Sequence, residues 1–157
     1  MECTHDEAWQ IATKSFRSVL PDAERAGLVI TPENVWNRFL VSPRDMRAFV
    51  DQFQSKAVAV HFDTGNCLQF GYPEDWILTL GPRIRRVHFK DFKLASGGRQ
   101  GQFVPLLEGD VNWRGVMSCL SKIGYQGFVS VEAGPDPKDT EYLLKLSRAM
   151  DRILAMG

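Results

Sequence analysis

Four short apolar runs recur along the chain, and each ends in a polar residue of a type that binds metal ions. They occupy residues 27–33 (GLVITPE), 57–63 (AVAVHFD), 83–91 (RIRRVHFKD, in which the strand ends at His88 and a polar tail follows) and 127–132 (GFVSVE). Their length and their β-branched residues are typical of buried strands. The pattern predicts strands over 28–31, 57–62 and 128–132, and a further strand that ends at His88.

Stretches with helical spacing separate these runs. Ser42 followed by Pro43 predicts a helix start, Asn112 is placed to cap a later helix, and Gly27 is a typical helix stop. Pro21 should kink or interrupt the first helix. The predicted helices cover residues 7–27, about 43–53, 73–80, 113–124 and 140–156.

This alternation of helix and strand predicts the α/β class, with one domain over residues 1–157. Parallel strands with crossover helices are compatible with two sheet architectures. One is a small open sheet that is complete by itself, and the other is half of an eight-stranded barrel, which typically needs about 250 residues. The pattern alone leaves both open. The connection at 93–110 is long, and loops of that length tend to be functional.

Charge and cysteine content narrow the functional classes. Nineteen basic and nineteen acidic residues give a net charge of zero, which argues against a nucleic-acid or membrane surface because both need a basic excess. Cys3, Cys67 and Cys119 lack CxxC spacing, so a disulfide framework or structural zinc is not expected and a reducing cytosol is favoured. The sequence contains no apolar run of membrane-spanning length and no secretory signal. We therefore expect a cytoplasmic protein.

The polar residues that end the four runs are Glu33, Asp63, His88 and Glu132. In parallel α/β folds, ligands bind beyond the carboxyl ends of the strands, so these side chains are expected to meet there. Carboxylates with one imidazole favour Mn²⁺ or Mg²⁺, with Co²⁺ and Zn²⁺ as alternatives. Taken singly, each acid would instead cap the next helix, and His88 would be an ordinary core histidine. Repetition at four strand ends favours the metal site.

Residues in and around the long connection are further candidates. Lys90 and Lys93 flank the end of the third strand and would bind a hydroxyl or phosphate, unless they are ordinary solvent-facing lysines. Glu108 would touch a ligand or support a metal ligand; alternatively, this segment serves only to cap the next helix through Asp110 or Asn112.

His61 lies two residues before Asp63 and shares its face of the strand, where it lines the site or simply packs. Cys67 has no neighbouring partner that would activate it as a nucleophile. Several aromatic residues either form an apolar wall for a sugar face or belong to the core: Trp36, Phe39, Phe70, Tyr72 and Trp113.

Five motifs in order carry a resemblance to a known family: ENVWN, HFDTGN, VHFKDFK, LLEGDVNW and SVEAGP. They resemble the second half of the sugar phosphate isomerase/epimerase family. This is the xylose isomerase-like TIM barrel group, which includes ketose 3-epimerases, hexulose-phosphate isomerases and ribulose-phosphate 3-epimerases. The resemblance covers nearly the whole chain. It implies a partial, half TIM barrel of four parallel βα units that correspond to strands 5–8.

The resemblance also implies roles for individual residues. Strands 5–8 of the family end in Glu, Asp, His and Glu, which bind one divalent metal, with Mn²⁺ expected first. The two glutamates of the family exchange the proton, so Glu33 and Glu132 inherit that role. Many ketose epimerases have a substrate-contacting histidine three residues after the aspartate, and Asn66 stands there. The metal set is then Glu33, Asp63, His88 and Glu132, and the substrate set Asn66, Lys90, Lys93, Glu108 and Trp113.

The implied function is a metal-dependent isomerase or epimerase that acts on a small sugar or sugar phosphate through an enediolate. The resemblance implies that strands one to four are missing, so self-association or pairing with a missing N-terminal half is expected. One alternative is a half barrel that binds metal or a partner without turnover. Another, less favoured, is a relative of apurinic-site endonucleases, whose chemistry uses several metals and more histidines than the three present.

Overall fold

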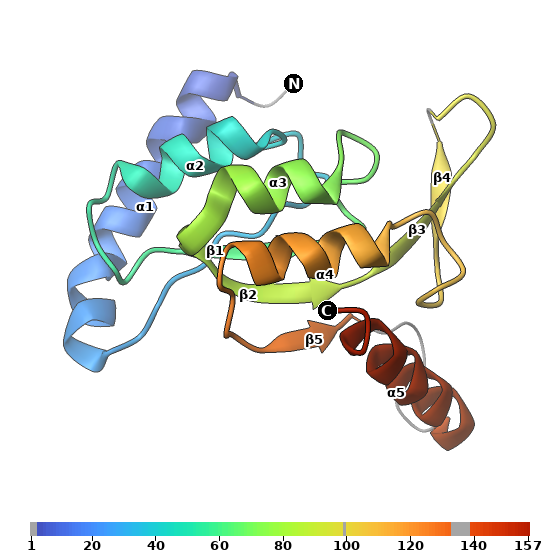
Figure 1. Ribbon diagram of the computed structural model, residues 1–157. Helices are drawn as coiled ribbons and strands as arrows, with labels where there is room; N and C mark the ends of the chain where they lie inside the picture. The colour runs from blue at the N-terminus through green and yellow to red at the C-terminus, as the bar shows by residue number, and fades with distance from the viewer. Residues whose placement is uncertain (1–2, 99, 133–138) are drawn as a thin grey trace.

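The computed structural model describes residues 3–98, 100–132 and 139–157. In its central sheet, each parallel strand lies beside the next parallel strand along the chain, as in a barrel wall and unlike in a doubly wound sheet. Figure 1 shows β2 (Ile84–Phe89) and β5 (Val129–Val131) pointing the same way, so their carboxyl ends lie at one end of the sheet. The last three residues of the motif SVEAGP, 133–135, lie outside the described residues. The parallel strands, in spatial order, are β1 (Val60–Asp63), β2 (Ile84–Phe89) and β5 (Val129–Val131).

The segment predicted as a strand over 28–31 is not a regular strand. Within the described chain it makes isolated parallel bridges with the β1 side, Ile30 with Val58 and Glu33 with His61. Pro32 has no N–H to give to a ladder, although its carbonyl accepts from the His61 N–H at 3.0 Å. The predicted four-strand half barrel is therefore found as three strands and a bridged edge segment. This segment still brings Glu33 to the same end of the sheet.

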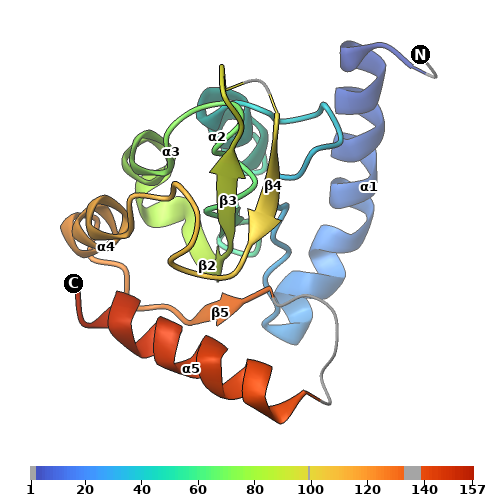
Figure 2. The same cartoon turned by 90° about the vertical axis from the view of Figure 1, so that its right-hand side faces the viewer.

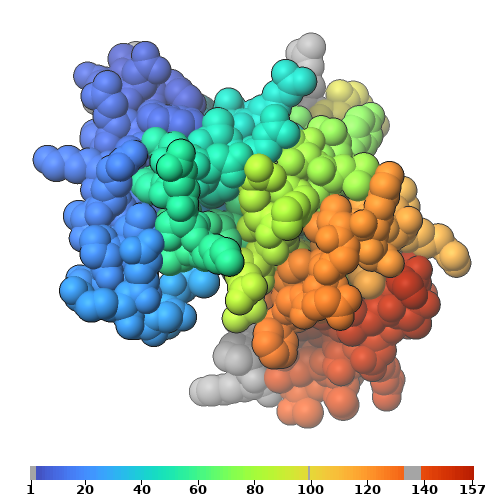
Figure 3. Space-filling view, turned by 60° about the vertical axis from the view of Figure 1, so that its left-hand side comes forward, coloured from blue at the N-terminus to red at the C-terminus, as the bar shows by residue number. Residues whose placement is uncertain are grey.

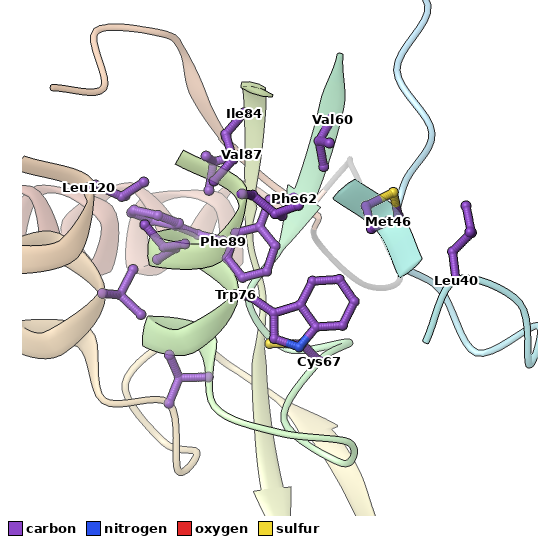
Figure 4. Packing of buried hydrophobic residues seen from close by; sticks show 14 of the residues in the cluster. Leu40, Met46, Val60, Phe62, Cys67, Trp76, Ile84, Val87, Phe89 and Leu120 are labelled. Carbon is purple, nitrogen blue, oxygen red and sulfur yellow. The ribbon is translucent and has the colours of Figure 1, made fainter. Parts of the chain in front are cut away.

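Three helices cover one face of the sheet (Figure 1). They bury alternate strand residues, and Val60, Phe62, Val87 and Phe89 are all 0 % exposed. Figure 4 shows Trp76 among these side chains, and its ring lies 6.1 Å from the ring of Phe62. Full burial of one large apolar side chain contributes about 1.5–3 kcal/mol, so this layer dominates the stability of the fold. The helices are α2 (Pro43–Asp51), α3 (Pro73–Leu80) and α4 (Trp113–Lys122).

Two longer helices flank this core, α1 (His5–Ala26) and α5 (Thr140–Leu154). In the space-filling view they lie on opposite sides of the molecule (Figure 3). Helix α1 runs through Pro21, so of the kink or interruption expected there, the interruption does not occur. Gly27 ends α1 in the left-handed conformation, with φ of 66°, as its assignment as a helix stop predicts.

The long connection contains a hairpin that the sequence pattern did not reveal. Strands β3 (Asp91–Leu94) and β4 (Gly101–Val104) pair antiparallel. Figure 2 shows the hairpin in front of the sheet, beyond the carboxyl end of β2. Phe92 of β3 is fully buried, and this anchors the hairpin. The hairpin therefore forms one wall beside the strand ends.

The face of the sheet away from the three helices is polar. His61 pairs with Arg86 across β1 and β2, and His88 pairs with Ser130 across β2 and β5. Arg86 and Ser130 are exposed, and both histidines are half-buried. Among the described helices there is none with the length and apolar character needed to cross a membrane.

Candidate metal centre

Glu33, Asp63, His88 and Glu132 lie together at the carboxyl end of the sheet. Each offers one ligand atom, and these atoms all lie within 4.8 Å of one another. Asp63 ends β1, His88 is the penultimate residue of β2, and Glu132 follows β5. The structure thus brings together the four residues that the strand pattern places at one end, and we call them the four-residue cluster.

Asp63 is the most enclosed member of the cluster. It is 0 % exposed, and its Oδ1 accepts a hydrogen bond from the Asn66 N–H at 2.7 Å. Its Oδ2 has no hydrogen-bond partner among the described residues. Burial raises the pKa of the Asp63 carboxyl to about 7, although the Asn66 N–H and the charge of Lys90 act to lower it. A buried polar atom without a partner calls for an explanation, and a bound cation supplies one.

Asn34 clamps the backbone of Asp63. The Asp63 N–H donates to Asn34 Oδ1 at 2.8 Å, and Asn34 Nδ2 donates to the Asp63 carbonyl at 2.9 Å. Asn34 is itself buried. Because Asn34 follows Glu33 directly, this clamp fixes the Glu33 backbone beside the end of β1. The strand pattern alone did not indicate Asn34; the signal lies in the motif ENVWN, which places an amide directly after a ligand.

Thr64 and Gly65 tie the end of β1 to the end of β2. Thr64 Oγ1 donates to the Lys90 carbonyl at 2.8 Å and accepts from the Lys90 N–H at 3.0 Å. A Cβ at Gly65 would stand 2.9 Å from the Lys90 carbonyl oxygen, so the absence of a side chain permits this close approach. These contacts fix the position of Asp63 relative to Lys90.

His88 faces Glu33 and packs against His61. Its Nδ1 lies 3.4 Å from Glu33 Oε1, and both side chains are about one-quarter exposed, at 23 % and 27 %. The His61 and His88 ring centroids are 3.9 Å apart. Burial, followed by the neighbouring His88, lowers the pKa of His61. A neutral imidazole is the form that binds metal ions.

Glu132 is the exposed member of the cluster, and Lys90 holds it. Lys90 Nζ donates to Glu132 Oε2 at 2.6 Å and lies 3.4 Å from Asn66 Oδ1. The hydrogen bond from Lys90 lowers the pKa of Glu132. The side chain of Glu132 is 50 % exposed, whereas that of Lys90 is 17 % exposed. Lys90 thus links the residue that follows β5 to the turn that follows β1.

A hollow of about 370 Å³ opens beside the cluster, within the size range of small-molecule sites. Its aromatic wall is formed by Trp36 and Phe103, whose stacked rings are 5.0 Å apart. Lys90 Nζ lies 4.3 Å from the centre of the Phe103 ring. Phe103 comes from the hairpin, which is why the strand pattern missed it. The lining residues are Glu33, Val35, Trp36, Asn66, His88, Lys90, Phe103 and Glu132.

Three residues of the predicted substrate set lie apart from this hollow. Trp113 is 5 % exposed and packs in the core, with Nε1 donating to Asp91 Oδ2 at 3.1 Å. Lys93 pairs with Asp110, and Glu108 is exposed. None of the three is among the lining residues of the hollow. Of the predicted substrate set, the structure places Asn66 and Lys90 there.

Asp91 holds the segment LLEGDVNW, residues 106–113, through hydrogen bonds. Its buried carboxylate accepts hydrogen bonds from the N–H groups of Leu107 and Gly109, at 2.9 and 3.1 Å. A Cβ at Gly109 would lie 2.0 Å from Asp91 Oδ1, so this position requires glycine. Asn112 caps α4 by accepting from the Gly115 N–H. The segment thus braces the hairpin, which was not expected, and its Asn112 caps α4, as the helix-capping interpretation of the sequence expected.

Comparison with known proteins gives one family over most of the chain. The sequence model of the xylose isomerase-like TIM barrels matches residues 2–150. A putative L-ribulose-5-phosphate 3-epimerase of Escherichia coli (strain K12) is 28 % identical over 149 residues, which are 92 % of this chain and 52 % of that protein. An inosose dehydratase of Lacticaseibacillus casei is 22 % identical over 165 residues, covering 93 % of this chain and 55 % of that protein.

A similar fold is found among solved structures. The IolI protein, solved with a bound zinc atom, has a TM-score of 0.84 at 16 % identity, covering 99 % of this chain and 59 % of that one. At this identity the likeness concerns the fold alone. The chain spans about half the length of the curated relatives it matches, 52 % and 55 % for the two named above.

Proposed function

The chain belongs to the xylose isomerase-like TIM barrel family, and we propose that it carries the metal and proton-transfer centre of a sugar or sugar phosphate isomerase or epimerase. The observation that carries the proposal is the convergence of Glu33, Asp63, His88 and Glu132 within 4.8 Å. The relatives include a putative L-ribulose-5-phosphate 3-epimerase and an inosose dehydratase. Their chemistries differ, so the reaction assigned here is the proton transfer next to a carbonyl.

The donor set fits one divalent cation. Three carboxylates and an imidazole suit Mn²⁺ first, with Mg²⁺, Co²⁺ or Zn²⁺ as alternatives. The unpartnered Oδ2 of the buried Asp63 supports the fit, because a cation would satisfy an oxygen that the described protein atoms leave alone. A divalent ion held there would supply Lewis-acid polarisation of a substrate carbonyl.

Glu33 and Glu132 are assigned the proton transfer. They enter from opposite sides of the cluster, Glu33 beside β1 and Glu132 beyond β5. One carboxylate would take the proton from the carbon next to the carbonyl, and the other would return a proton to the resulting enediolate. Lys90 lowers the pKa of Glu132, which keeps Glu132 ionised and so able to accept the proton.

Asn66, Lys90 and the aromatic wall are assigned to substrate binding. Lys90 Nζ and the Asn66 side chain both line the hollow and present donors for hydroxyl or phosphate oxygens. Trp36 and Phe103 would pack against the apolar face of a sugar. Trp36 is held in place by donating its indole N–H to the Asn66 carbonyl at 2.8 Å.

The alternative function, a half barrel that binds a partner without turnover, is supported by the open edges of the sheet. Leu28 is 63 % exposed at one edge and Phe128 is 76 % exposed at the other. We propose that further protein covers these edges, either a second copy of this chain or the preceding half of a barrel. Sedimentation of the purified chain tests this. A compact monomer with ordinary ketose turnover would contradict it.

The deciding experiment is turnover of a panel of ketoses and ketose phosphates by the purified chain with Mn²⁺. Proton NMR in deuterated water reads the first step directly, because the hydrogen next to the carbonyl exchanges with solvent even when little product forms. Exchange that depends on Mn²⁺ and is lost in Glu132→Gln supports the proposal. Metal binding without any hydrogen exchange would instead support the alternative, a half barrel that binds metal without turnover.

A further inference from the structure

The proposed centre does not use His61, although its imidazole is placed like a ligand. His61 points from β1 to the polar face of the sheet, two residues before Asp63 and on the same side of the strand. Its Nε2 is buried, and among the described residues it has no hydrogen-bond partner. A buried ring nitrogen without a partner is costly unless something else satisfies it.

His61 shares a second set of ligand atoms with Glu33 and His88. The ligand atoms of these three residues all lie within 4.8 Å of one another. Glu33 bridges to His61 along the sheet edge, and the His88 ring packs against the His61 ring at 3.9 Å. These three side chains thus form a compact group that overlaps the four-residue cluster.

The donor types of this group differ from those of the four-residue cluster. Two imidazoles and one carboxylate, with a fourth position free, are typical of Zn²⁺ sites, whereas a carboxylate-rich set suits Mn²⁺ or Mg²⁺. With bonds of about 2.0–2.1 Å, a tetrahedral Zn²⁺ holds neighbouring ligand atoms about 3.4 Å apart. His88 Nδ1 and Glu33 Oε1 are already 3.4 Å apart.

We infer that Glu33, His61 and His88 form a second cation position, which takes Zn²⁺-type ions and excludes an ion from the four-residue cluster. The exclusion follows because both positions need Glu33 and His88. An ion at the second position would also occupy Glu33, which the proposed function assigns to proton transfer. Zn²⁺ bound there would therefore inhibit an enzyme that Mn²⁺ supports; this consequence rests on the proposed function.

The charges around His61 are compatible with such an ion. The charges of Glu33 and Glu132 act to raise the pKa of His61, whereas His88 and Arg86 act to lower it. The Arg86 guanidinium is drawn toward the exposed Phe128 ring, 5.3 Å from its centre. The two carboxylates are thus the charges that favour a cation at this position.

Binding of the metal alone tests the inference. Zn²⁺ and Mn²⁺ affinities are measured by calorimetry for the wild type, His61→Asn and Asp63→Asn, with His5→Asn on the exposed start of α1 as the matched control. We expect His61→Asn to lower Zn²⁺ affinity at least tenfold and Mn²⁺ affinity less than threefold. Asp63→Asn should do the reverse. Zn²⁺ affinity unchanged within twofold in His61→Asn, or equal losses for both ions, overturns the inference.

Co²⁺ provides a structural readout, because it absorbs strongly in a tetrahedral site and weakly in an octahedral one. The strong band should appear in the wild type, persist in Asp63→Asn and vanish in His61→Asn. If His61→Asn does not fold, side-chain ¹⁵N NMR of the wild type decides: Zn²⁺ should shift both His61 and His88, and Mg²⁺ only His88. A Zn²⁺ shift confined to His88 contradicts the second position.

The two proposals fail separately. If Asp63→Asn leaves Mn²⁺ binding unchanged while His61→Asn removes Zn²⁺ binding, the four-residue centre is wrong and the second position stands. If the opposite pattern appears, the four-residue centre stands alone.

Discussion

The two halves of the cluster are built differently. On the β1 side, Asp63 is 0 % exposed, and its backbone is held by a buried asparagine. On the β5 side, the Glu132 side chain is 50 % exposed and is held by Lys90. We call these the enclosed half and the open half. Enclosure fixes a ligand in advance but costs stability when no cation is bound, whereas an open carboxylate costs little and is free to change its role.

The largest expected effect is the loss of turnover when the open half loses its base. Glu132→Gln keeps the shape and one oxygen but removes the base, so turnover by any active assembly should fall about 10²–10⁴-fold. Asp63→Ala and His88→Ala remove a ligand outright, so excess Mn²⁺ should partly restore their rates. Steady-state rates across a Mn²⁺ series provide the comparison. Recovery of Glu132→Gln to near wild-type rate would make Glu132 a ligand only.

The next largest effect is the loss of stability when the enclosed half loses its backbone clamp. Asn34→Ala leaves the buried N–H and carbonyl of Asp63 without their amide partner, so the free energy of unfolding should fall by about 2–4 kcal/mol. Urea unfolding in the presence of a chelator measures it. Asn37→Ala, in the same segment but exposed, is the matched control and should cost under about 1 kcal/mol. Equal losses in the two variants would mean that the clamp does not matter.

The pH dependence of stability sharpens the same contrast. The pKa of Asp63 is raised from 3.8 to about 7 in the folded state, so between these pH values the folded chain binds the extra proton. Stability of the metal-free protein should therefore fall as pH rises through this window, by about 1–3 kcal/mol.

Unfolding from pH 4 to 8 with a chelator present measures this slope, alongside Asp63→Asn. That variant should lack this part of the slope and be the more stable form at pH 8. A wild-type curve that rises across the window, or a variant with the same fall, would show that Asp63 is not a strained carboxylate.

The smallest effect concerns the open half in the absence of metal. Glu132→Ala removes an ion pair whose carboxylate is half exposed, and such pairs contribute about 0–1 kcal/mol. Unfolding in chelator should therefore change little, in contrast to Asn34→Ala. A loss above about 2 kcal/mol would mean that the open half is as tightly built as the enclosed one.

The strand-terminal positions of the ligands were predictable because a local pattern encodes them. Apolar runs that end in Asp63, His88 and Glu132 indicate both the strand and the polar residue at its end. The helix cap at Asn112 and the stop at Gly27 are local in the same way. These features depend on a few neighbouring residues, so a single sequence contains them.

What the sequence did not reveal depends on contacts between distant segments. The segment at 28–31 has a strand composition, but Pro32 interrupts its ladder with β1. The hairpin and its Phe103 take shape through Asp91, whose carboxylate accepts hydrogen bonds from backbone N–H groups up to 20 positions away. Trp113 was expected beside the substrate for its aromatic character, yet Asp91 draws its indole into the core.

The most direct test of the four-residue centre is a count of bound Mn²⁺ by electron paramagnetic resonance. The wild-type chain should bind one Mn²⁺, and Asp63→Ala should bind it at least tenfold more weakly because the enclosed ligand is lost. His61→Asn, which leaves all four ligands in place, should bind Mn²⁺ within threefold of the wild type. Mn²⁺ binding that is absent in the wild type, or unchanged in Asp63→Ala, would contradict the account.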